Sequence, residues 1–278
     1  MEQGTGPVML RRKVGITLRA LRATAGVTPQ DAADRIFCHP SKISRIERGD
    51  APLKPREVVA LLDLYGVAAA EAESVLADVR ATNRQPWWHQ YQDAVPGWAR
   101  GYLGMEAEAS TIRCYAPYTV PDLFQTDSYA DSLAKLPSRP GPETARLREM
   151  RTGRQAVVRG HGRVLQAVID ESALLRATGG PDVMREQCTA LIQAAKEPGV
   201  SIRILRLSAG AHRDGGVPFT LLRFADPALD DVVYVETPAT GIYAEKPDDL
   251  DVYRELATRL ELASEPASAT PDILAGLW

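Results

Sequence analysis

The sequence has little cysteine and no pattern typical of a metal site. Its cysteines are widely spaced and odd in number, with no CxxC pair and no Cys/His cluster. They are Cys38, Cys114 and Cys188. A disulfide framework needs paired cysteines, and a structural zinc site needs closely spaced ligands. We therefore expect neither of these, and we expect no bound metal and no cofactor.

Long apolar runs are also missing. No segment approaches the roughly 20 apolar residues that span a bilayer, and residues 1–7 contain no signal-peptide core. These absences predict a cytoplasmic protein that has no membrane partner.

Catalytic motifs are missing as well, because the chain contains no GxSxG or P-loop pattern. Asp170 and Glu171 follow a predicted strand and could form an acid/base pair. Capping of the next helix explains the same two acids more simply. The sequence therefore predicts a protein that is not an enzyme.

The chain as a whole lacks the excess of positive charge common in nucleic-acid-binding proteins. Its 278 residues are 45% apolar and 25% charged, with a net charge of -3, which is typical of a globular protein long enough for two domains. Residues 1–65, however, contain 11 Lys and Arg against 7 Asp and Glu, whereas the remainder contains 22 against 29. Attraction to phosphate is screened beyond roughly 8 to 10 Å at physiological salt, so the basic N-terminal part is the candidate for nucleic-acid binding.

Within this basic part lies a short predicted helix with both ends marked. Pro40 suits the first helical position, and Gly49 suits the left-handed position after the last turn. Ile43 and Ile46 share one face, which can anchor the helix. The polar side chains on its remaining surface are Ser41, Lys42, Arg45 and Arg48. An anchoring face opposite a basic, hydrogen-bonding face is what a DNA-reading helix requires.

Two further helices are predicted before it. Apolar residues at helical spacing from Val14 to Ala25 predict the first, which ends at Gly26. Thr28 and Asp31 fit an N-cap and a first-turn acid of the second, which extends to about residue 36. Residues 37–40 are then too few for anything but a sharp corner between helices.

These helices resemble the phage-repressor, or XRE-type, helix-turn-helix. The resemblance is carried by Arg22, Thr28, Ala33 and residues 43–49. It implies that the third helix enters the major groove and places Ser41, Lys42 and Arg45 nearest the base edges. Arginine can bind guanine O6 and N7 together, and serine can serve either base, so these residue types suit that position.

Other residues are expected at the DNA backbone or in the scaffold. Arg48, Lys54 and Arg56 are candidates for phosphate contacts beside the reading helix. Thr28 and Gln30 lie at the start of the second helix, where exposed N–H groups favour phosphate. The resemblance also implies a structural ion pair between Arg22 and Glu47, which joins the first and third helices.

The sequence departs from the XRE-type pattern at its corner and at two glutamine positions. Phe37 stands where many relatives have glycine, which suits a corner that needs a permissive backbone. Pro29 and Pro40 stand where relatives have glutamines that hold phosphate and base. The contacts of those glutamines must then come from other groups, such as Gln30.

The expected architecture is multidomain. An all-α, five-helix helix-turn-helix domain over residues 1–82 precedes a larger mixed α/β (α+β) domain over residues 83–278. Short runs rich in Val, Ile and Leu predict strands at residues 164–169, 201–207, 219–224 and 232–236. The helices expected between the first two strands allow a right-handed crossover, so these strands are predicted to be parallel neighbours, and the later ones antiparallel. A final helix is predicted over residues 248–263.

The larger part resembles the C-terminal domain of the actinobacterial WhiJ-like regulators. The motifs that carry this resemblance include residues 87–91, 106–109, 120–121, 154–155, 208–212, 219–224 and 245–247. It implies a transcriptional regulator of development or secondary metabolism, often encoded beside a small partner protein. Asp122 departs from this pattern, because relatives usually have glycine there.

Several residues of this part are candidates for contact with a small-molecule effector or a partner protein. They are Trp87, Trp88, Tyr91, Arg151, Arg154 and His212. Aromatic side chains this dense can form a ligand cage, although packing explains them more simply. Arg148, Arg151 and Arg154 recur at helical spacing and could clamp an anion or an acidic partner, although a solvated face is the favoured interpretation.

Together these patterns predict a sequence-specific DNA-binding transcriptional regulator, with a repressor-like reading domain and a sensing and dimerisation domain. One reading helix contacts too few base pairs to select an operator, so we expect a homodimer on an inverted repeat of double-stranded DNA. The alternative is a protein-docking or antitoxin-like scaffold that uses the helix-turn-helix as an interaction module.

Overall fold

The structure is a computed structural model that describes residues 7–135, 144–159, 162–210, 216–237 and 239–278. The chain forms two compact units, Met1–His89 and Gln90–Trp278. The first is helical and the second combines a sheet with helices, which confirms the predicted multidomain α+β architecture. From the sequence the boundary was expected after residue 82.

The described part of the first unit consists of five α-helices and most of a 3-10 helix. The α-helices are α1 (Pro7–Thr24), α2 (Pro29–Arg35), α3 (Pro40–Glu47), α4 (Pro55–Leu64) and α5 (Ala69–Ala81), and the 3-10 helix is η1 (Trp87–Tyr91). Their shared core includes Val14, Leu18, Ile43, Ile46, Leu61 and Leu62. Because Ile43 and Ile46 are buried in it, the opposite face of α3 is left to polar side chains.

Close approach of the α1 and α3 backbones sets the position of α3. A Cβ atom on Gly15 would lie 2.6 Å from the carbonyl oxygen of Ile46, so only glycine fits between the two backbones. Gly49, which has a φ of +77°, ends α3 beside Arg12 of α1.

The corner between α2 and α3 is strained at one residue. Phe37 has a φ of +52°, a left-handed conformation in which a Cβ atom is unfavourable. After it the chain turns back, and the N–H of Cys38 donates to the carbonyl oxygen of Ala33 at 2.9 Å. The Phe37 side chain is 97% exposed, so no packing within the described chain compensates for the strain.

The second unit contains a six-stranded mixed sheet with the order β3-β2-β1-β4-β5-β6. The strands are β1 (Thr111–Ala116), β2 (Val164–Asp170), β3 (Val200–Leu205), β4 (Phe219–Arg223), β5 (Val232–Glu236) and β6 (Gly241–Ala244). β2 pairs in parallel with both β1 and β3, while β4 to β6 are antiparallel. The four predicted strands and the parallel pairing of β2 with β3 are confirmed, whereas β1 and β6 were not predicted.

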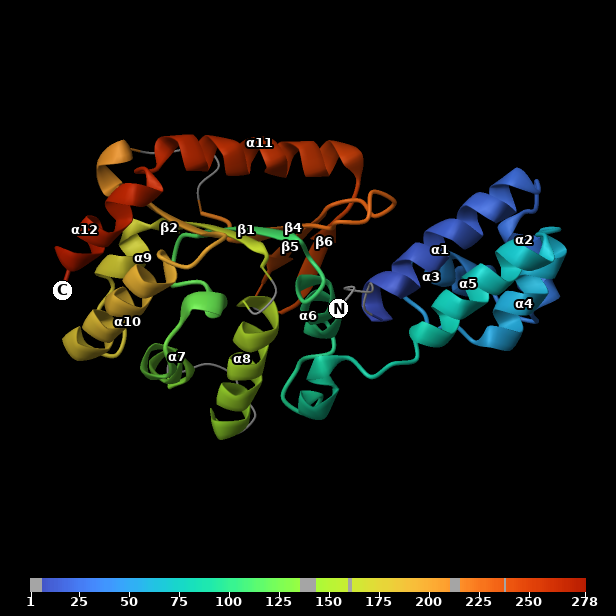
Figure 1. Ribbon diagram of the computed structural model, residues 1–278, viewed down its shortest axis with the longest axis horizontal. Helices are drawn as coiled ribbons and strands as arrows, with labels where there is room; N and C mark the ends of the chain where they lie inside the picture. The colour runs from blue at the N-terminus through green and yellow to red at the C-terminus, as the bar shows by residue number, and fades with distance from the viewer. Residues whose placement is uncertain (1–6, 136–143, 160–161, 211–215, 238) are drawn as a thin grey trace. The chain divides into compact units, whose positions relative to one another are not determined.

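Helices cover both faces of this sheet (Figure 1). The α-helices are α6 (Ala99–Glu106), α7 (Asp127–Ala134), α8 (Thr144–Arg159), α9 (Glu171–Leu175), α10 (Pro181–Ala194), α11 (Pro247–Ala263) and α12 (Thr270–Ala275). The short 3-10 helices are η2 (Asp122–Phe124), η3 (Leu207–Ala209) and η4 (Ala267–Ala269). Leu250, Leu256 and Leu260 of α11 pack on one face against β-strand residues such as Val233. Helices α8 and α10 lie on the opposite face.

The last residue of the chain is docked rather than free. The indole N–H of Trp278 donates to the carbonyl oxygen of Leu174 at 2.9 Å. Within the described ranges, no helix combines the length and the apolar character needed to cross a membrane.

The strained corner generates a stability prediction. Phe37→Gly should stabilise the first unit by about 0.5 to 1 kcal/mol, because relief of the left-handed strain exceeds the entropy that glycine adds to the unfolded chain. Native-state hydrogen exchange of the buried amides around Ile43 should then slow by roughly two- to fivefold. Phe37→Ala keeps the Cβ atom and is the matched control, for which no such gain is expected. Faster exchange in the glycine variant would contradict the strain argument.

Candidate nucleic-acid interface and ligand cavity

The N-terminus of α3 is held by a side chain that the sequence reading overlooked. His39 occupies the N-cap, and its Nδ1 accepts from the backbone N–H of Ser41 at 3.2 Å. The same nitrogen lies 2.9 Å from the Ser41 hydroxyl oxygen. Ser41 is exposed, so its hydroxyl stands at the start of the reading helix beside the imidazole. The position before a first-turn proline is the usual cap position, and this signal could have identified His39.

The basic side chains of α3 and its C-cap differ in their partners. Lys42 forms an ion pair with Glu57 of α4, with 2.7 Å between Nζ and Oε1. Arg48 forms one with Asp50, with 2.9 Å between Nε and Oδ2. Arg45 is exposed and forms no ion pair with a described residue; its Nη2 donates only to the carbonyl oxygen of Asp50 at 3.4 Å. Arg45 is therefore the α3 cation whose charge is not offset by a bonded carboxylate.

The residues expected at the DNA backbone lie on the surface of the same unit. Thr28 caps α2 in a reciprocal arrangement with Asp31, and the neighbouring Gln30 is exposed. The Asp31 carboxylate thus stands at the helix N-terminus that was expected to attract phosphate. Lys54 and Arg56 are exposed at the start of α4.

Arg22 and Glu47 form a bidentate ion pair between α1 and α3. The distances are 2.6 Å from Nε to Oε1 and 3.1 Å from Nη2 to Oε2. Arg22 also donates to the carbonyl oxygen of Val27 at 2.9 Å. The side chains are only 13% and 9% exposed, and the hydrogen bond that Arg22 donates to Glu47 raises the pKa of Arg22. This pair ties the reading helix to its scaffold.

The aromatic candidates of the sequence all belong to one short 3-10 helix. Trp87, Trp88 and Tyr91 form η1, and the guanidinium of Arg146 lies 4.9 Å from the centroid of the Tyr91 ring. None of the three lines the cavity. His212 lies outside the described residues.

Of the three evenly spaced arginines on α8, only Arg148 is exposed, at 46%. Arg148 pairs with Asp131, and Arg151 pairs with Asp127. Arg154 is only 11% exposed and pairs with Glu106. The solvated-face interpretation is wrong for Arg151 and Arg154, because acids on neighbouring elements draw these side chains inward.

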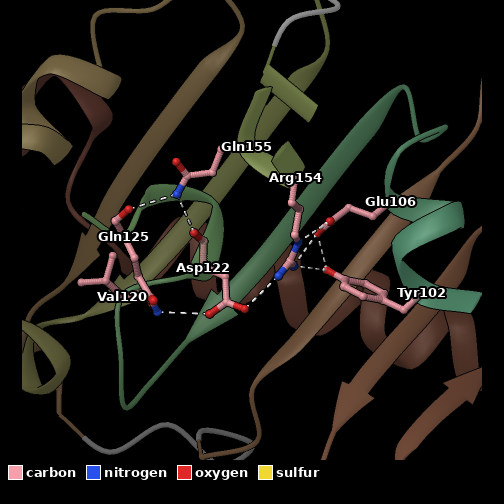
Figure 2. A network of polar contacts seen from close by, with 7 residues as sticks. All are labelled: Tyr102, Glu106, Val120, Asp122, Gln125, Arg154 and Gln155. Atoms are coloured by element: carbon pink, nitrogen blue, oxygen red, sulfur yellow. Dashed lines mark hydrogen bonds and ion pairs between the residues drawn. The ribbon is translucent and has the colours of Figure 1, made fainter. Parts of the chain in front are cut away.

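Figure 2 shows the polar network that surrounds Arg154. Its Nε lies 2.6 Å from Oε2 of Glu106, and its Nη2 lies 2.8 Å from Oε1. Its Nη1 donates to Asp122 at 2.8 Å. The Tyr102 hydroxyl donates to Glu106 at 2.6 Å. Burial opposes the charge of Arg154, but the charge and hydrogen bonds of Glu106 outweigh it, so its pKa is raised well above the ordinary value.

Two glutamines hold the η2 turn against α8 (Figure 2). Gln155 donates to the backbone oxygens of Asp122 and Gln125, each at 3.0 Å. Gln125 donates to the carbonyl oxygen of Val120 at 2.7 Å. Asp122 does not have a positive φ, so this turn has no need of the glycine found in relatives. Its side chain instead supplies a carboxylate to Arg154.

A cavity of about 420 Å³ adjoins this network. It lies beside the carboxyl end of β1 and is also lined by residues of β4 and β5. Its volume falls within the range of small-molecule sites. The lining residues most relevant to binding are Tyr102, Glu106, Tyr118, Asp122, Arg154, Tyr234 and Glu236.

Cys114 lines the cavity, and Asp170 and Glu171 lie at the end of β2. Burial raises the pKa of the Cys114 thiol to about 12, which disfavours the nucleophilic thiolate. Asp170 caps α9 by accepting from the N–H of Ser172 at 2.8 Å, and Glu171 pairs with Arg206. In the described ranges, no group of three or more His, Cys, Asp or Glu side chains is placed to hold a metal ion.

Among the described residues that line this cavity, Arg154 is the one predicted from the sequence as a contact residue. Tyr102 and Tyr118 were not predicted from the sequence as ligand contacts. Glu106 and Asp122 were noticed only as family positions. Tyr234 and Glu236 alternate on β5 and therefore share a face, a period-two signal that was available in the sequence. Nothing in the sequence showed which side of the sheet contained a cavity.

Comparison with known families agrees with both units. Residues 13–75 match the model of a helix-turn-helix domain, which indicates DNA binding and transcription regulation. Residues 99–276 match a domain of unknown function (DUF5753), and because this match covers more than half of the chain, the protein belongs to that family. No curated protein matches the chain.

The buried pair generates a stability prediction for the second unit. Glu106→Ala should cost about 3 to 5 kcal/mol, because it leaves the buried Arg154 charge uncompensated. The double variant Glu106→Leu with Arg154→Met removes both charges and should recover most of that loss. Urea unfolding followed by circular dichroism measures these differences.

The matched control is Glu255→Ala, which removes a 70% exposed partner of Arg259 on α11. It should cost less than about 1 kcal/mol. Equal losses for Glu106→Ala and Glu255→Ala would show that the Arg154 pair is not a buried constraint.

Proposed function

We propose that this protein is a sequence-specific transcriptional regulator of the XRE type that reads DNA with α3 and acts as a repressor. The observation that best supports the proposal is that Arg45 is exposed and has no carboxylate partner among the described residues. Arg45 lies on a helix anchored by buried Ile43 and Ile46. An arginine in this state is available for the bidentate contact with guanine.

The paired cations are proposed to play a lesser part in selecting sequence. Lys42 would have to leave Glu57 before it reached a base edge, and Arg48 would have to leave Asp50. Exposed Lys54 and Arg56, at the start of α4, are proposed to contact phosphate together with Arg48, and Thr28 and Gln30 to do so at α2. Phosphate contacts orient a protein on the duplex without selecting bases.

The protein is further proposed to act as a homodimer on an inverted repeat. One helix the length of α3 contacts only a few base pairs. A genome presents on the order of 10⁶ or more competing non-specific sites, so these few contacts cannot select one operator. Two copies would place their half-site centres roughly 34 Å, or a multiple of that distance, apart. The second unit is the proposed dimerisation unit, because most apolar side chains of the first, such as Ile43, Ile46 and Leu61, are used in its own core.

We propose that the second unit responds to a small ligand or a partner protein without a catalytic step. The cavity of about 420 Å³ beside Arg154 supports the ligand response. The resemblance to WhiJ-like regulators supports a role in development or secondary metabolism, and a small partner protein encoded nearby.

A protein-docking function of the first unit is the second candidate. Phe37 favours it, because an aromatic side chain that is 97% exposed in a strained corner has no role in the described core. The acid partners of Lys42 and Arg48 also weaken the positive field that DNA requires.

The assignment of Arg45 is tested by comparing variants over a library of duplexes. Arg45→Ala should cost about 1 to 3 kcal/mol at the preferred site and relax selection at one base position. Lys54→Ala is the control, since loss of a phosphate contact should weaken all sequences alike and reduce the salt dependence. A uniform loss from Arg45→Ala would refute the reading role, and sequence-blind binding by the native protein would favour docking.

The place of the dimer contact is tested by light scattering at micromolar concentration. The full-length protein and a fragment of residues 83–278 should both be dimeric, because the contact is assigned to the second unit. A monomeric fragment beside a dimeric full-length protein would assign the contact to the first unit instead.

A further inference from the structure

The cavity beside Arg154 has an unequal charge balance. Its described lining contains three carboxylates, from Glu106, Asp122 and Glu236, and one guanidinium, from Arg154, which leaves two negative charges in excess. Glu106 is fully buried, and its oxygens already accept from Arg154 and Tyr102. The excess charge therefore resides on Asp122 and Glu236, which are the more exposed carboxylates of the lining.

Glu236 is the carboxylate without a partner. It forms no hydrogen bond or ion pair with any described residue, although it lies at the end of β5 in the cavity wall. Partial desolvation and repulsion by Asp122 raise the pKa of Glu236, whereas the positive charge of Arg154 lowers it. A carboxylate in this situation gains most from a cation that enters the cavity.

Tyr234 adds a second unsatisfied group on the same face of β5. Its side chain is 3% exposed, and its hydroxyl finds no hydrogen-bond partner among the described residues. Its ring stacks on Tyr102 with 4.0 Å between centroids. Gly241 leaves room for the ring, since a Cβ atom there would lie 2.4 Å from it. Buried hydroxyls are normally hydrogen-bonded, so this hydroxyl is an exception among the residues of the cavity wall.

The remaining wall is largely apolar. Pro117, Pro121, Pro218 and Phe219 line it, together with Tyr118, which is 52% exposed. These flat surfaces favour an aromatic or other apolar body, and aromatic faces also attract cations. The guanidinium of Arg154 is already bonded to the carboxylates of Glu106 and Asp122. An anionic ligand would therefore find no free positive charge in the described lining and would be repelled by the two excess negative charges.

We propose that this cavity binds a small primary amine with an aromatic body, whose ammonium group is held by Glu236 and Asp122. Three N–H donors on one positive centre match the two more exposed carboxylates of a largely apolar cavity. The inference deepens the ligand response proposed above and rests on it for its regulatory meaning. The binding itself is independent of DNA.

Calorimetry on the full-length protein tests the ligand class with probes matched in shape. Phenethylamine, 2-phenylethanol and 3-phenylpropionate present an ammonium, a hydroxyl and a carboxylate on the same ring and chain. The amine should bind at least about tenfold more tightly than the alcohol, and the carboxylate most weakly. Tyramine and tryptamine extend the panel. Failure of all three amines to bind at millimolar concentration, or tighter binding of the carboxylate, would overturn the proposal.

Variants locate the ammonium group. Glu236→Gln should weaken amine binding roughly tenfold, since it removes the charge from a side chain that forms no internal bond. Asp122→Asn should also weaken it. Glu255→Gln on α11 is the control and should leave the affinity unchanged. Unchanged affinity in the Glu236 variant would overturn the assignment of this site.

Two further measurements test whether the amine is a free small molecule or a protein side chain, and whether its binding affects DNA binding. Nα-acetyl-lysine amide presents the ammonium as a partner protein would, and tighter binding of it than of the aromatic amines would overturn the assignment to a small free amine. Operator affinity is then measured with and without phenethylamine. Amine binding with no change in operator affinity supports the ligand class and refutes the proposed regulatory response, whereas operator binding without amine binding refutes the ligand class alone.

Discussion

A buried guanidinium must be paired, and the second unit is arranged to meet that requirement. Arg154 from α8 meets Glu106 at the end of α6, and Glu106 is fully buried. Removal of both charges from water is costly, so their remaining hydrogen-bonding capacity must be used as well. The Tyr102 hydroxyl and the Asp122 carboxylate use it. Because these groups come from separate elements, one ion pair fixes α6, α8 and η2 around the cavity.

The first unit uses charge in a different way. Arg22 and Glu47 lie at the contact between α1 and α3 and hold the reading helix in place. Acids also pair with Lys42 and Arg48 at the surface. This pairing reduces the conformational freedom of the long side chains, and it leaves Arg45 as the α3 cation without a carboxylate partner in the described chain.

Local signals made most of the fold predictable. The bounds of α3 follow from Pro40 and Gly49, and its buried face follows from Ile43 and Ile46, because caps and periodicity act within a few residues. β1 was not predicted, since Arg113 interrupts its apolar run, and β6 was not, since it is four residues long and begins with Gly241. Both strands exist because neighbouring strands pair with them.

The sequence by itself determined the two-part architecture and the helix-turn-helix. Only the tertiary structure decided that Arg154 is buried rather than solvated, and that Glu236 and Tyr234 face a cavity. The physical reason is distance along the chain. Helix caps and apolar spacing are set by neighbours, whereas the desolvation and pairing of Arg154 depend on Glu106, which is 48 residues away.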